Sequence, residues 1–412
     1  ACGLKQGDWV RLAIPLQLVF HPLMDISADP QSAGQEPGGA TTLRFGAIAD
    51  IQYADVEDRR GRRYRGTLDV ASRAVDFFNE SKDLSFLLHA GDIVDFYNTE
   101  GEFAGDGGRA TADALGAVMS RLSQAKCPHL VSLVGNHELY NWSREELMQG
   151  VPWQAATGAK DETSTHPEAQ GVLRFCPESS STLWHQFKPC PGWRCVVLDP
   201  YDVSVYRKGR GPGPPPFNYD LDAEALARLC QMNPNVADFV REHPGENILC
   251  DYFKDLPPGP CQRWVPFNGA IGPDQMSWLR EQLAAAAEQD ERVIVLSHLL
   301  VHPESSDNRT LLWNYEEILE LLQSPLGRAV QIVVSGHQHS GGFHTDELGI
   351  HYVVMESPLL TSPGMPGCYL TFEADGAVLS IEGFSNADSK IFPGLVEGQL
   401  GYRRLPLRSS HA

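Results

Sequence analysis

The sequence predicts an α/β fold, because strand-like runs alternate with helical segments and polar motifs follow the strands. Most of the strand-like runs are continuously apolar and rich in β-branched residues, as expected of strands covered on both faces. Seven of them are spread over the chain: Leu43–Ala49, Leu84–Leu88, His129–Val134, Cys195–Leu198, Arg292–Leu296, Gln331–Val334 and His351–Met355. Each lies within the usual length of a strand in a globular protein.

Helical patterns and one hairpin occupy the segments between these runs. Apolar residues at i, i+3, i+4 and i+7 over residues 115–122 predict one buried helix face. Residues 143–146 (Ser-Arg-Glu-Glu) resemble a capping box that opens a short helix, and Pro273 marks the first turn of another. Cys368–Phe384 is typical of a hairpin closed by Asp375-Gly376.

The motifs favour one catalytic domain over two, because they are distributed along the chain. We expect an irregular N-terminal extension over residues 1–42, a catalytic domain over residues 43–385 and a C-terminal tail over residues 386–412. Arg207–Tyr219 and His243–Pro266 are rich in proline, so both are predicted to be surface loops, and either could shape a substrate cleft.

The charge of the chain argues against a nucleic acid as its partner. The 412 residues carry 33 Lys and Arg against 53 Asp and Glu, a formal net charge of −20. Such a surface repels DNA and RNA. A small anionic substrate stays possible, since bound metal ions can reverse the local potential. The acidic balance therefore favours a metal-dependent enzyme over a nucleic-acid-binding module.

Cysteines and hydropathy indicate an intracellular protein without a membrane partner, and we expect it to be a monomer. The nine cysteines are scattered and form no CxxC pair, which argues against a zinc ribbon or a secreted disulfide framework. Leu12–Phe20 is far too short to span a bilayer and has no basic n-region or cleavage pattern. We therefore expect a cytoplasmic location with free thiols.

Five short polar motifs begin where apolar runs end. They are Asp50-Ile51-Gln52, Gly91-Asp92-Ile93-Val94-Asp95, Gly135-Asn136-His137-Glu138, Ser297-His298 and Gly336-His337-Gln338-His339. Taken singly, each fits a turn or a helix cap better than a functional site. Taken together, they place oxygen and nitrogen donors at the carboxyl ends of buried strands, where α/β folds carry out their chemistry. This set predicts two divalent metal ions and hydrolysis of a phosphate ester or anhydride.

The order D-x-[HQ], GD-x-x-D, GNH[DE], a lone His after a strand and GH-x-H resembles the signature of the calcineurin-like metallophosphoesterases. Longer strings are similar to the manganese-dependent ADP-ribose/CDP-alcohol diphosphatases. These strings are residues 45–55, 135–141, 267–269, 306–308, 313–315 and 336–342. The resemblance covers residues 43–385. It implies a four-layer αββα sandwich, with two mixed β-sheets face to face and helices on the outside.

The resemblance also implies the ligands of two adjacent metals. The first metal would be held by Asp50, Gln52, Asp92 and His339. The second would be held by Asp92, Asn136, His298 and His337, so that Asp92 bridges both. Gln52 stands where the superfamily usually has histidine, in agreement with the diphosphatases. Because an amide oxygen is harder than imidazole, we expect Mn²⁺, with Mg²⁺ as a possibility, in preference to zinc.

By the same resemblance, His137 is the catalytic acid and not a ligand. Asp95 is placed to hydrogen-bond His137 and fix its orientation. Purple acid phosphatases need a tyrosine at the position of Asp95, so their iron chemistry is not expected. Thr310 stands where the diphosphatases carry a cysteine, which leaves the exact substrate open. The arginine cluster Arg62-Arg63-Tyr64-Arg65 fits either a solvated turn or a phosphate contact.

The function that the resemblance implies is hydrolysis of small nucleoside-diphosphate substrates. ADP-ribose would give AMP and ribose 5-phosphate, and CDP-choline would give CMP and phosphocholine. Three alternatives stay open. They are the same fold with another substrate (a cyclic-nucleotide phosphodiesterase or a phosphoprotein phosphatase), a non-catalytic scaffold that binds proteins, and a structural metal-binding protein.

Overall fold

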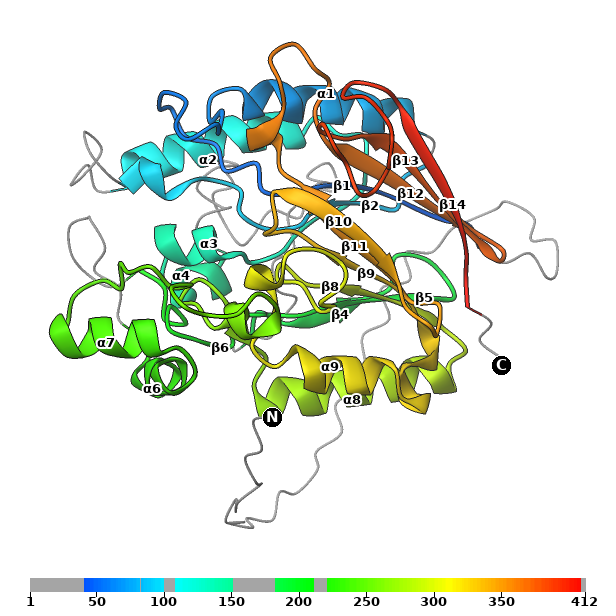
Figure 1. Ribbon diagram of the computed structural model, residues 1–412. Coiled ribbons are helices and arrows are strands. Elements are labelled where there is room, and N and C mark those ends of the chain that lie inside the picture. The colour runs from blue at the N-terminus through cyan, green and yellow to red at the C-terminus, as the bar shows by residue number, and fades with distance from the viewer. Residues whose placement is uncertain (1–40, 82, 100–107, 151–181, 211–220, 409–412) are drawn as a thin grey trace. The chain divides into compact units, whose positions relative to one another are not determined.

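Two six-stranded mixed β-sheets lie at the centre of the structure (Figure 1). The computed structural model describes residues 41–81, 83–99, 108–150, 182–210 and 221–408, so nearly all of the predicted extension over residues 1–42 lies outside these residues. The first sheet has the strand order β14-β13-β12-β1-β2-β3. Its strands are β1 (Leu43–Ile48), β2 (Phe86–His89), β3 (Leu130–Ser132), β12 (Tyr369–Asp375), β13 (Val378–Phe384) and β14 (Gly401–Pro406).

The second sheet has the order β10-β11-β9-β8-β5-β4, and a two-stranded ribbon is formed by β6 and β7. These strands are β4 (His185–Phe187), β5 (Trp193–Val197), β6 (Val203–Ser204), β7 (Gly269–Ala270), β8 (Arg292–Leu296), β9 (Val330–Ser335), β10 (Ser340–Thr345) and β11 (His351–Glu356). Within each sheet the central strands are parallel: β1, β2 and β3 in the first, and β5, β8, β9 and β11 in the second. Their carboxyl ends therefore share one edge of each sheet.

Helices cover the outer faces of both sheets. Helices α1 and α2 lie over the first sheet, and α8 and α9 lie against the second (Figure 1). Helices α6 and α7 pack beside β6 (Figure 1). The helices are α1 (Thr67–Glu80), α2 (Arg109–Leu122), α3 (Asn136–Asn141), α4 (Arg144–Met148), α6 (Ala223–Met232), α7 (Pro234–Glu242), α8 (Pro273–Glu288) and α9 (Tyr315–Leu322). The arrangement is the expected αββα sandwich.

A layer of apolar side chains holds the two sheets face to face. The Phe45 ring of β1 stacks between Phe86 and Phe372, with ring centroids 4.8 and 4.5 Å away. Residues of the second sheet, Val197 and Ile294 among them, belong to the same buried cluster. Burial of each such large side chain contributes about 1.5–3 kcal/mol to the stability of the fold. The two sheets are therefore held together by the side chains packed between them.

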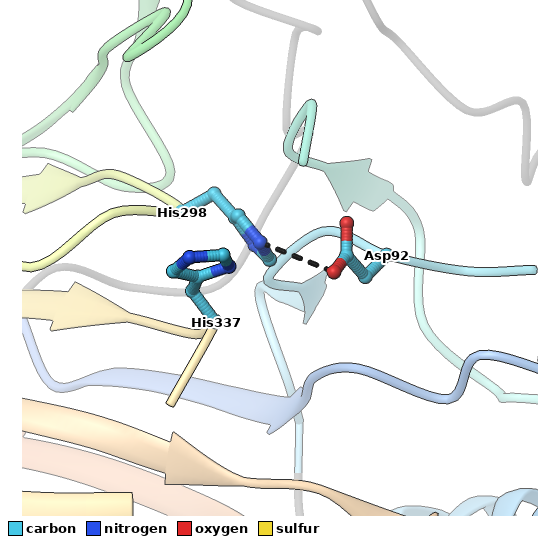
Figure 2. Close-up of side chains that lie close together, drawn as sticks. All are labelled: Asp92, His298 and His337. Atoms are coloured by element: carbon cyan, nitrogen blue, oxygen red, sulfur yellow. Dashed lines mark ion pairs between the residues drawn. The ribbon is translucent and has the colours of Figure 1, made fainter. Parts of the chain in front are cut away.

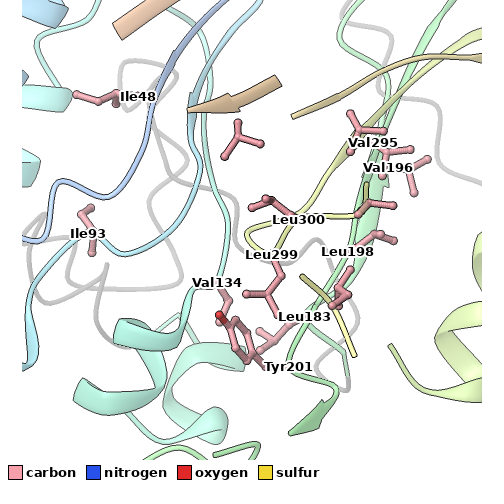
Figure 3. Packing of buried hydrophobic residues seen from close by; sticks show 14 of the residues in the cluster. Ile48, Ile93, Val134, Leu183, Val196, Leu198, Tyr201, Val295, Leu299 and Leu300 are labelled. Atoms are coloured by element: carbon pink, nitrogen blue, oxygen red, sulfur yellow. The ribbon is translucent and has the colours of Figure 1, made fainter. Parts of the chain in front are cut away.

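Apolar residues within the polar motifs anchor the loops that leave the strands. Ile51, Ile93 and Leu299 each directly follow a predicted metal ligand, and none of the three is exposed to solvent. They belong to the cluster of which Figure 3 shows a part, with Val134 and Leu299 on facing loops. Because each anchor is buried, its polar neighbour is held in a defined position.

The structure confirms the seven predicted strands, with ends that differ by at most two residues. The helix predicted from residue 115 is α2, which begins earlier, at Arg109. Helix α4 has the expected capping box on Ser143, and α8 begins at Pro273. The hairpin of β12 and β13 is also confirmed. Of the two predicted loops, residues 211–219 lie outside the described residues, and His243–Pro266 contains the 3-10 turn Pro260–Arg263.

The structure corrects the predicted C-terminal tail over residues 386–412. Gly401–Pro406 forms β14, which pairs with β13 along its whole length. Asn386 and Ser389 also bond the buried carboxylate of Glu356. The segment through residue 408 therefore completes the first sheet. After a buried first residue, β14 alternates between exposed and half-buried side chains, so it lacks the continuous apolar run that marked the central strands.

Within the described ranges, no helix is long and apolar enough to cross a membrane.

Candidate metal centre

The loops after five parallel strands meet at one place between the sheets. The first sheet contributes the loops after β1, β2 and β3, and the second contributes the loops after β8 and β9. Backbone hydrogen bonds join them: Asp50 N donates to Gly91 O at 3.0 Å, and Gly336 N donates to His298 O at 3.1 Å. The His337 amide donates to the Asp50 carboxylate at 3.0 Å and so links the two sheets.

Four of the seven predicted ligands have a left-handed backbone. Asp50, Gln52, Asp92 and His337 have φ values of 49°, 41°, 61° and 66°. Residues other than glycine rarely adopt this conformation, which costs of order 1–3 kcal/mol each. Such strain persists only where the surrounding structure enforces it, and it gathers at functional sites. Strain at four ligands is therefore independent support for a functional centre here.

Close backbone approach explains the glycines of the motifs. A Cβ atom on Gly135 would lie 2.1 Å from Asp92 Oδ1, and one on Gly91 would lie 2.4 Å from His298 Nδ1. Both distances are far below contact, so a side chain at either position would displace a predicted ligand.

The Asp92 carboxylate is the centre of the cluster. Its Oδ2 accepts a bond from Gln52 Nε2 at 2.9 Å and lies 3.4 Å from His298 Nε2. Figure 2 shows Asp92 facing His298, with His337 beside it. Donor atoms of Asp92, His298 and His337 all lie within 4.8 Å of one another. The Asp92 carboxylate thus contacts predicted ligands from both sheets, Gln52 and His298.

Gln52, His339 and Asp50 form a second group around Asp92. His339 Nε2 lies 3.0 Å from Gln52 Nε2 and 3.7 Å from Asp50 Oδ1. Ligand atoms at neighbouring positions of an octahedral cation are about 3 Å apart, as follows from metal–oxygen distances of roughly 2.1 Å. Gln52 Oε1 is buried and accepts no hydrogen bond from any residue that the structure describes. Rotation of the amide by a half turn would present this oxygen to the same partners.

Hydrogen bonds on the far side of two imidazoles determine which nitrogen faces the cluster. His298 Nδ1 donates to Ala90 O at 2.7 Å, which leaves the buried Nε2 without a hydrogen-bond partner. His337 Nε2 donates to Asn268 Oδ1 at 3.1 Å, which leaves its Nδ1 free to coordinate. Metal-binding histidines almost always donate their other N–H to such an acceptor. We therefore expect His298 to coordinate through Nε2 and His337 through Nδ1.

Asn268 belongs to the matching string over residues 267–269, and the structure shows that it orients the His337 ring. Its side-chain nitrogen donates to Arg263 O at 2.9 Å and to Arg309 O at 2.7 Å. These two bonds turn Oδ1 toward His337. The residue is completely buried, so its amide has no freedom to rotate into solvent.

Asn136 begins α3 and is 5% exposed. Its Oδ1 accepts a bond from the Tyr201 hydroxyl at 3.3 Å, and the Tyr201 ring lies 6.3 Å from that of His298. Asn136 thus lies on the His298 side of the centre, as its assignment to the second metal requires.

Glu138 is the functional residue that the sequence analysis missed. Its carboxylate accepts three backbone bonds, from Asp92 N at 2.9 Å, Ile93 N at 2.8 Å and Gly135 N at 2.6 Å. Burial and the charge of Asp92 raise its pKa to about 7. The acidic residue that closes the GNH[DE] pattern is the feature of the sequence that could have identified Glu138. Glu138 joins the loops after β2 and β3 and so positions Asp92.

The predicted hydrogen bond between Asp95 and His137 is absent. Asp95 Oδ2 lies 3.5 Å from His137 Nδ1 and has no hydrogen-bond partner. Nδ1 accepts a bond from the Phe96 amide at 3.2 Å instead. The backbone bond arises because Phe96 follows Asp95 directly and its N–H is closer to the ring. In the neutral ring the proton is therefore on Nε2, which lies 4.0 Å from Asp92 Oδ2.

Burial and opposite charges determine the protonation of the cluster. Burial lowers the pKa of His339 to about 3 and that of His337 well below its usual value, so both rings stay neutral. Burial also acts to lower the pKa of His298, but the Asp92 carboxylate outweighs it and raises that pKa to about 10. A cation bound at Asp92 would replace this proton, since metal ligation requires neutral imidazole.

The residues fit a pair of divalent cations. Carboxylate, amide and imidazole donors converge from five loops, and neither Gln52 Oε1 nor His298 Nε2, both buried, makes a hydrogen bond with the part of the chain that the structure describes. Hard oxygen donors together with imidazole suit manganese and related divalent ions. Buried acceptors of this kind are costly unless a ligand satisfies them.

Comparisons with known proteins agree with this picture. A profile of the calcineurin-like phosphoesterases matches residues 43–188. The manganese-dependent ADP-ribose/CDP-alcohol diphosphatase of Mus musculus is 32% identical over 327 residues, which are 77% of this chain and 84% of the mouse protein. The enzyme of that name from Homo sapiens is 32% identical over 348 residues, 82% of this chain and 89% of the human protein. A dimetal phosphatase from Danio rerio superposes with a TM-score of 0.65 at 27% identity, covering 88% of this chain and 98% of that structure.

The two-sheet fold, the convergence of donors at the strand ends and these matches define the class: the protein is a metallophosphoesterase, and hence a hydrolase. Within that class, the chain belongs to the family of the manganese-dependent ADP-ribose/CDP-alcohol diphosphatases.

Proposed function

We propose that the protein hydrolyses the diphosphate bond of small nucleoside-diphosphate derivatives, with two divalent cations, most favourably Mn²⁺. ADP-ribose would yield AMP and ribose 5-phosphate, and CDP-choline would yield CMP and phosphocholine. The relatives with the corresponding name match over more than three quarters of this chain, which supports the substrate class.

The observation that carries the proposal is the buried donor cluster around Asp92. Gln52 contacts both Asp92 and His339, His339 lies near Asp50, and His298 and His337 lie beside Asp92. In the proposal Asp92 holds one cation together with Asp50, Gln52 and His339, and the other together with Asn136, His298 and His337. Two such ions supply an activated water and neutralise charge on the phosphoryl oxygens.

Residues of the chain orient the substrate and the leaving group. His137 is 6% exposed, so it can reach substrate while it stays shielded from bulk water. The Phe96 amide fixes its Nδ1 as an acceptor, so that Nε2–H points toward the Asp92 side. In the proposal Nε2–H donates to the oxygen of the departing phosphate. Such a donor stabilises charge that develops as the diphosphate bond breaks.

A substrate panel tests the proposal directly. The purified chain is assayed with Mn²⁺ against ADP-ribose, CDP-choline, cyclic AMP and a phosphopeptide, and products are separated by chromatography. We expect AMP and ribose 5-phosphate from ADP-ribose at a rate well above those of the last two substrates. Turnover of only cyclic AMP or only the phosphopeptide would assign another activity of the same fold. Absence of turnover with all four would favour a non-catalytic scaffold.

The role of His137 is tested by His137→Ala. We expect turnover to fall by about 100-fold or more, the usual contribution of a positioned proton donor, while the bound manganese measured by elemental analysis stays near two per chain. Loss of manganese in the variant would make His137 a ligand or its support and would contradict the proposed role.

A further inference from the structure

The residue that directly follows β11 contacts two loops of the metal centre, and the proposed function does not yet account for it. This residue is Ser357, which is completely buried. Because β11 pairs in parallel with β9, Ser357 leaves the second sheet at the same edge as the loop that carries His337 and His339. A hydroxyl buried away from water needs hydrogen-bond partners, since leaving it unpaired is costly.

Ser357 binds the main chain of two predicted ligands of the first cation. Its amide N–H donates to His339 O at 3.0 Å, and its hydroxyl donates to Asp50 O at 2.8 Å. The side chains of these two ligands are close together, with His339 Nε2 3.7 Å from Asp50 Oδ1. Asp50 follows the first sheet and His339 the second, so a single residue joins the two ligand loops across the sheets.

The second hydrogen bond of the Ser357 hydroxyl fixes its direction. Its oxygen accepts the Leu359 N–H at 3.2 Å, as the cap of the 3-10 turn Pro358–Leu360. A hydroxyl has one proton to donate, and here the Asp50 carbonyl receives it. Asp50 has a left-handed backbone, with a φ value of 49°, which persists only where the surrounding structure enforces it. The Ser357 hydroxyl is one of the groups that enforce it.

Asn386 holds Ser357 from the C-terminal segment. Its side-chain nitrogen donates to Ser357 O at 3.0 Å, and its Oδ1 accepts a bond from the Thr361 hydroxyl at 2.9 Å. Because Thr361 binds the oxygen end of the amide, the nitrogen end stays on Ser357. Asn386 is 6% exposed and lies between β13 and β14. The last two strands of the first sheet therefore support the centre through Ser357.

Different groups orient the imidazoles that are assigned to the second cation. His298 donates to Ala90 O, and His337 donates to Asn268 Oδ1. Ser357 instead binds Asp50 and His339, which are both assigned to the first cation. Loss of its hydroxyl should therefore weaken the binding of one cation and spare the other.

We propose that Ser357 is a positioning residue for the first cation: it holds Asp50 against His339, and Asn386 keeps Ser357 in place. The inference rests on the proposed function, because it takes Asp50 and His339 to share one cation. Removal of a group that orients metal ligands typically weakens metal affinity about 10- to 100-fold.

Manganese binding to the full-length chain, measured by titration calorimetry without substrate, tests the inference. We expect Ser357→Ala to weaken one of the two Mn²⁺ ions about tenfold and to leave the other within about twofold of wild type. Asn386→Ala should weaken the same ion by a smaller factor. Ser305→Ala is the matched control, because Ser305 is also buried and its hydroxyl bonds the carbonyl of His302, which is not a predicted ligand. It should change neither ion.

A double-mutant cycle identifies the cation on which Ser357 acts. His339→Ala lacks a ligand of the first cation, and there Ser357→Ala should not weaken the remaining Mn²⁺ further. Asn136→Ala lacks a ligand of the second cation, and there Ser357→Ala should weaken the remaining Mn²⁺ about tenfold. A residue that only stabilised the fold would lower affinity alike in both backgrounds. Asn386→Ala allows the same comparison if Ser357→Ala does not fold.

Three results would overturn the inference. Equal weakening of both ions, or the same loss in both backgrounds, would show that Ser357 acts through the fold. Unchanged binding would show that it positions no ligand. A wild type that binds fewer than two Mn²⁺ ions would refute the inference together with the assignment of the metals. If two ions bind but ADP-ribose is not cleaved, the proposed function fails separately, and the binding data still decide the role of Ser357.

Discussion

The two β-sheets contribute to the metal centre in different ways. The first sheet supplies oxygen donors, from Asp50, Gln52, Asp92 and Asn136, and three of these have a left-handed backbone. The second sheet supplies three imidazoles. Backbone N–H groups and Gln52 hold the carboxylates of the first half, whereas acceptor oxygens hold the ring nitrogens of His298 and His337.

Each half of the centre is held in place by the other half. His298 from the second sheet donates to Ala90 O of the first, and Asp50 from the first sheet accepts the amide of His337. Ser357, just after β11, donates to Asp50 O at 2.8 Å. Neither set of ligands is therefore preorganised before the sheets pack. The oxygen donors combine a strained loop backbone with contacts to distant N–H groups, whereas the imidazoles of His298 and His337 are oriented by distant acceptor oxygens.

The largest effect is expected where both halves meet, at Asp92. Asp92→Asn replaces the shared carboxylate by a neutral amide, which cannot balance two cations. We expect turnover of ADP-ribose to fall about a thousandfold or more, with a small change in melting temperature. Turnover within tenfold of wild type, measured at saturating Mn²⁺, would show that Asp92 does not bridge the ions.

On the oxygen side, Glu138→Gln breaks the support of Asp92 without touching a ligand. The amide group of glutamine cannot accept all three backbone bonds, and each buried N–H left without an acceptor costs about 1–3 kcal/mol. We expect a lower melting temperature and a 10- to 100-fold weaker Mn²⁺ affinity, measured by titration calorimetry. Glu145→Gln on the exposed face of α4 is the control and should change neither. An unaltered Mn²⁺ affinity in Glu138→Gln would show that Glu138 does not position Asp92.

On the imidazole side, Asn268→Ala removes the acceptor of His337. The ring then loses the bond that fixes which nitrogen faces the cluster. We expect Mn²⁺ affinity to fall about 10-fold, near the lower end of effects for such supporting groups. Asn314→Ala is a matched control, because Asn314 is also buried and bonds the backbone of Ile271, but contacts no ligand. Equal losses of affinity in both variants would mean that the effect is one of folding.

A further test replaces an oxygen donor of the first sheet by a nitrogen donor. Gln52→His places an imidazole on the oxygen side, and nitrogen donors favour zinc. We expect the ratio of zinc to manganese bound in a competition experiment to rise about tenfold, with moderate loss of turnover. An identical metal profile in variant and wild type would contradict the idea that the amide oxygen sets metal preference.

The smallest effect on turnover is expected at Glu356, which lies in β11 and faces the C-terminal segment. Burial raises its pKa to about 7, above the value of about 4.3 in an unfolded chain. The native carboxyl keeps its proton while the unfolded one has lost it. The free energy of unfolding should therefore fall by up to about 3 kcal/mol as the pH rises from about 4.5 to 7.

Glu356→Gln removes this titration. The free energies of unfolding of variant and wild type are measured by urea titration at pH 5 and pH 7.5. The variant should become more stable relative to the wild type as the pH rises, because only the wild type loses stability through Glu356. A pH-independent difference would show that Glu356 titrates normally in the native protein. Turnover at saturating Mn²⁺ serves as the control and should be close to wild type at both pH values.

Local patterns were sufficient to predict much of the fold and the composition of the centre. The continuous apolar runs identified the central strands, because strands buried on both faces need apolar residues throughout. β14 was not predicted from the sequence, because an edge strand with alternating exposure resembles a polar tail. Asp95 was expected to bond His137, but the backbone amide of Phe96 does so. Sequence spacing places such groups near one another without deciding between a side chain and the main chain.

By itself, the sequence determined the central strands, the points at which they end and the type of donor at each end, because these follow from hydrophobic pattern and turn chemistry over a few residues. Only the tertiary structure decided that Glu138 holds the Asp92 loop and that Asn268 selects the free nitrogen of His337. Glu138 lies 46 residues from Asp92, and Asn268 lies 69 residues from His337. Contacts at such separations depend on how the two sheets pack, which no local pattern encodes.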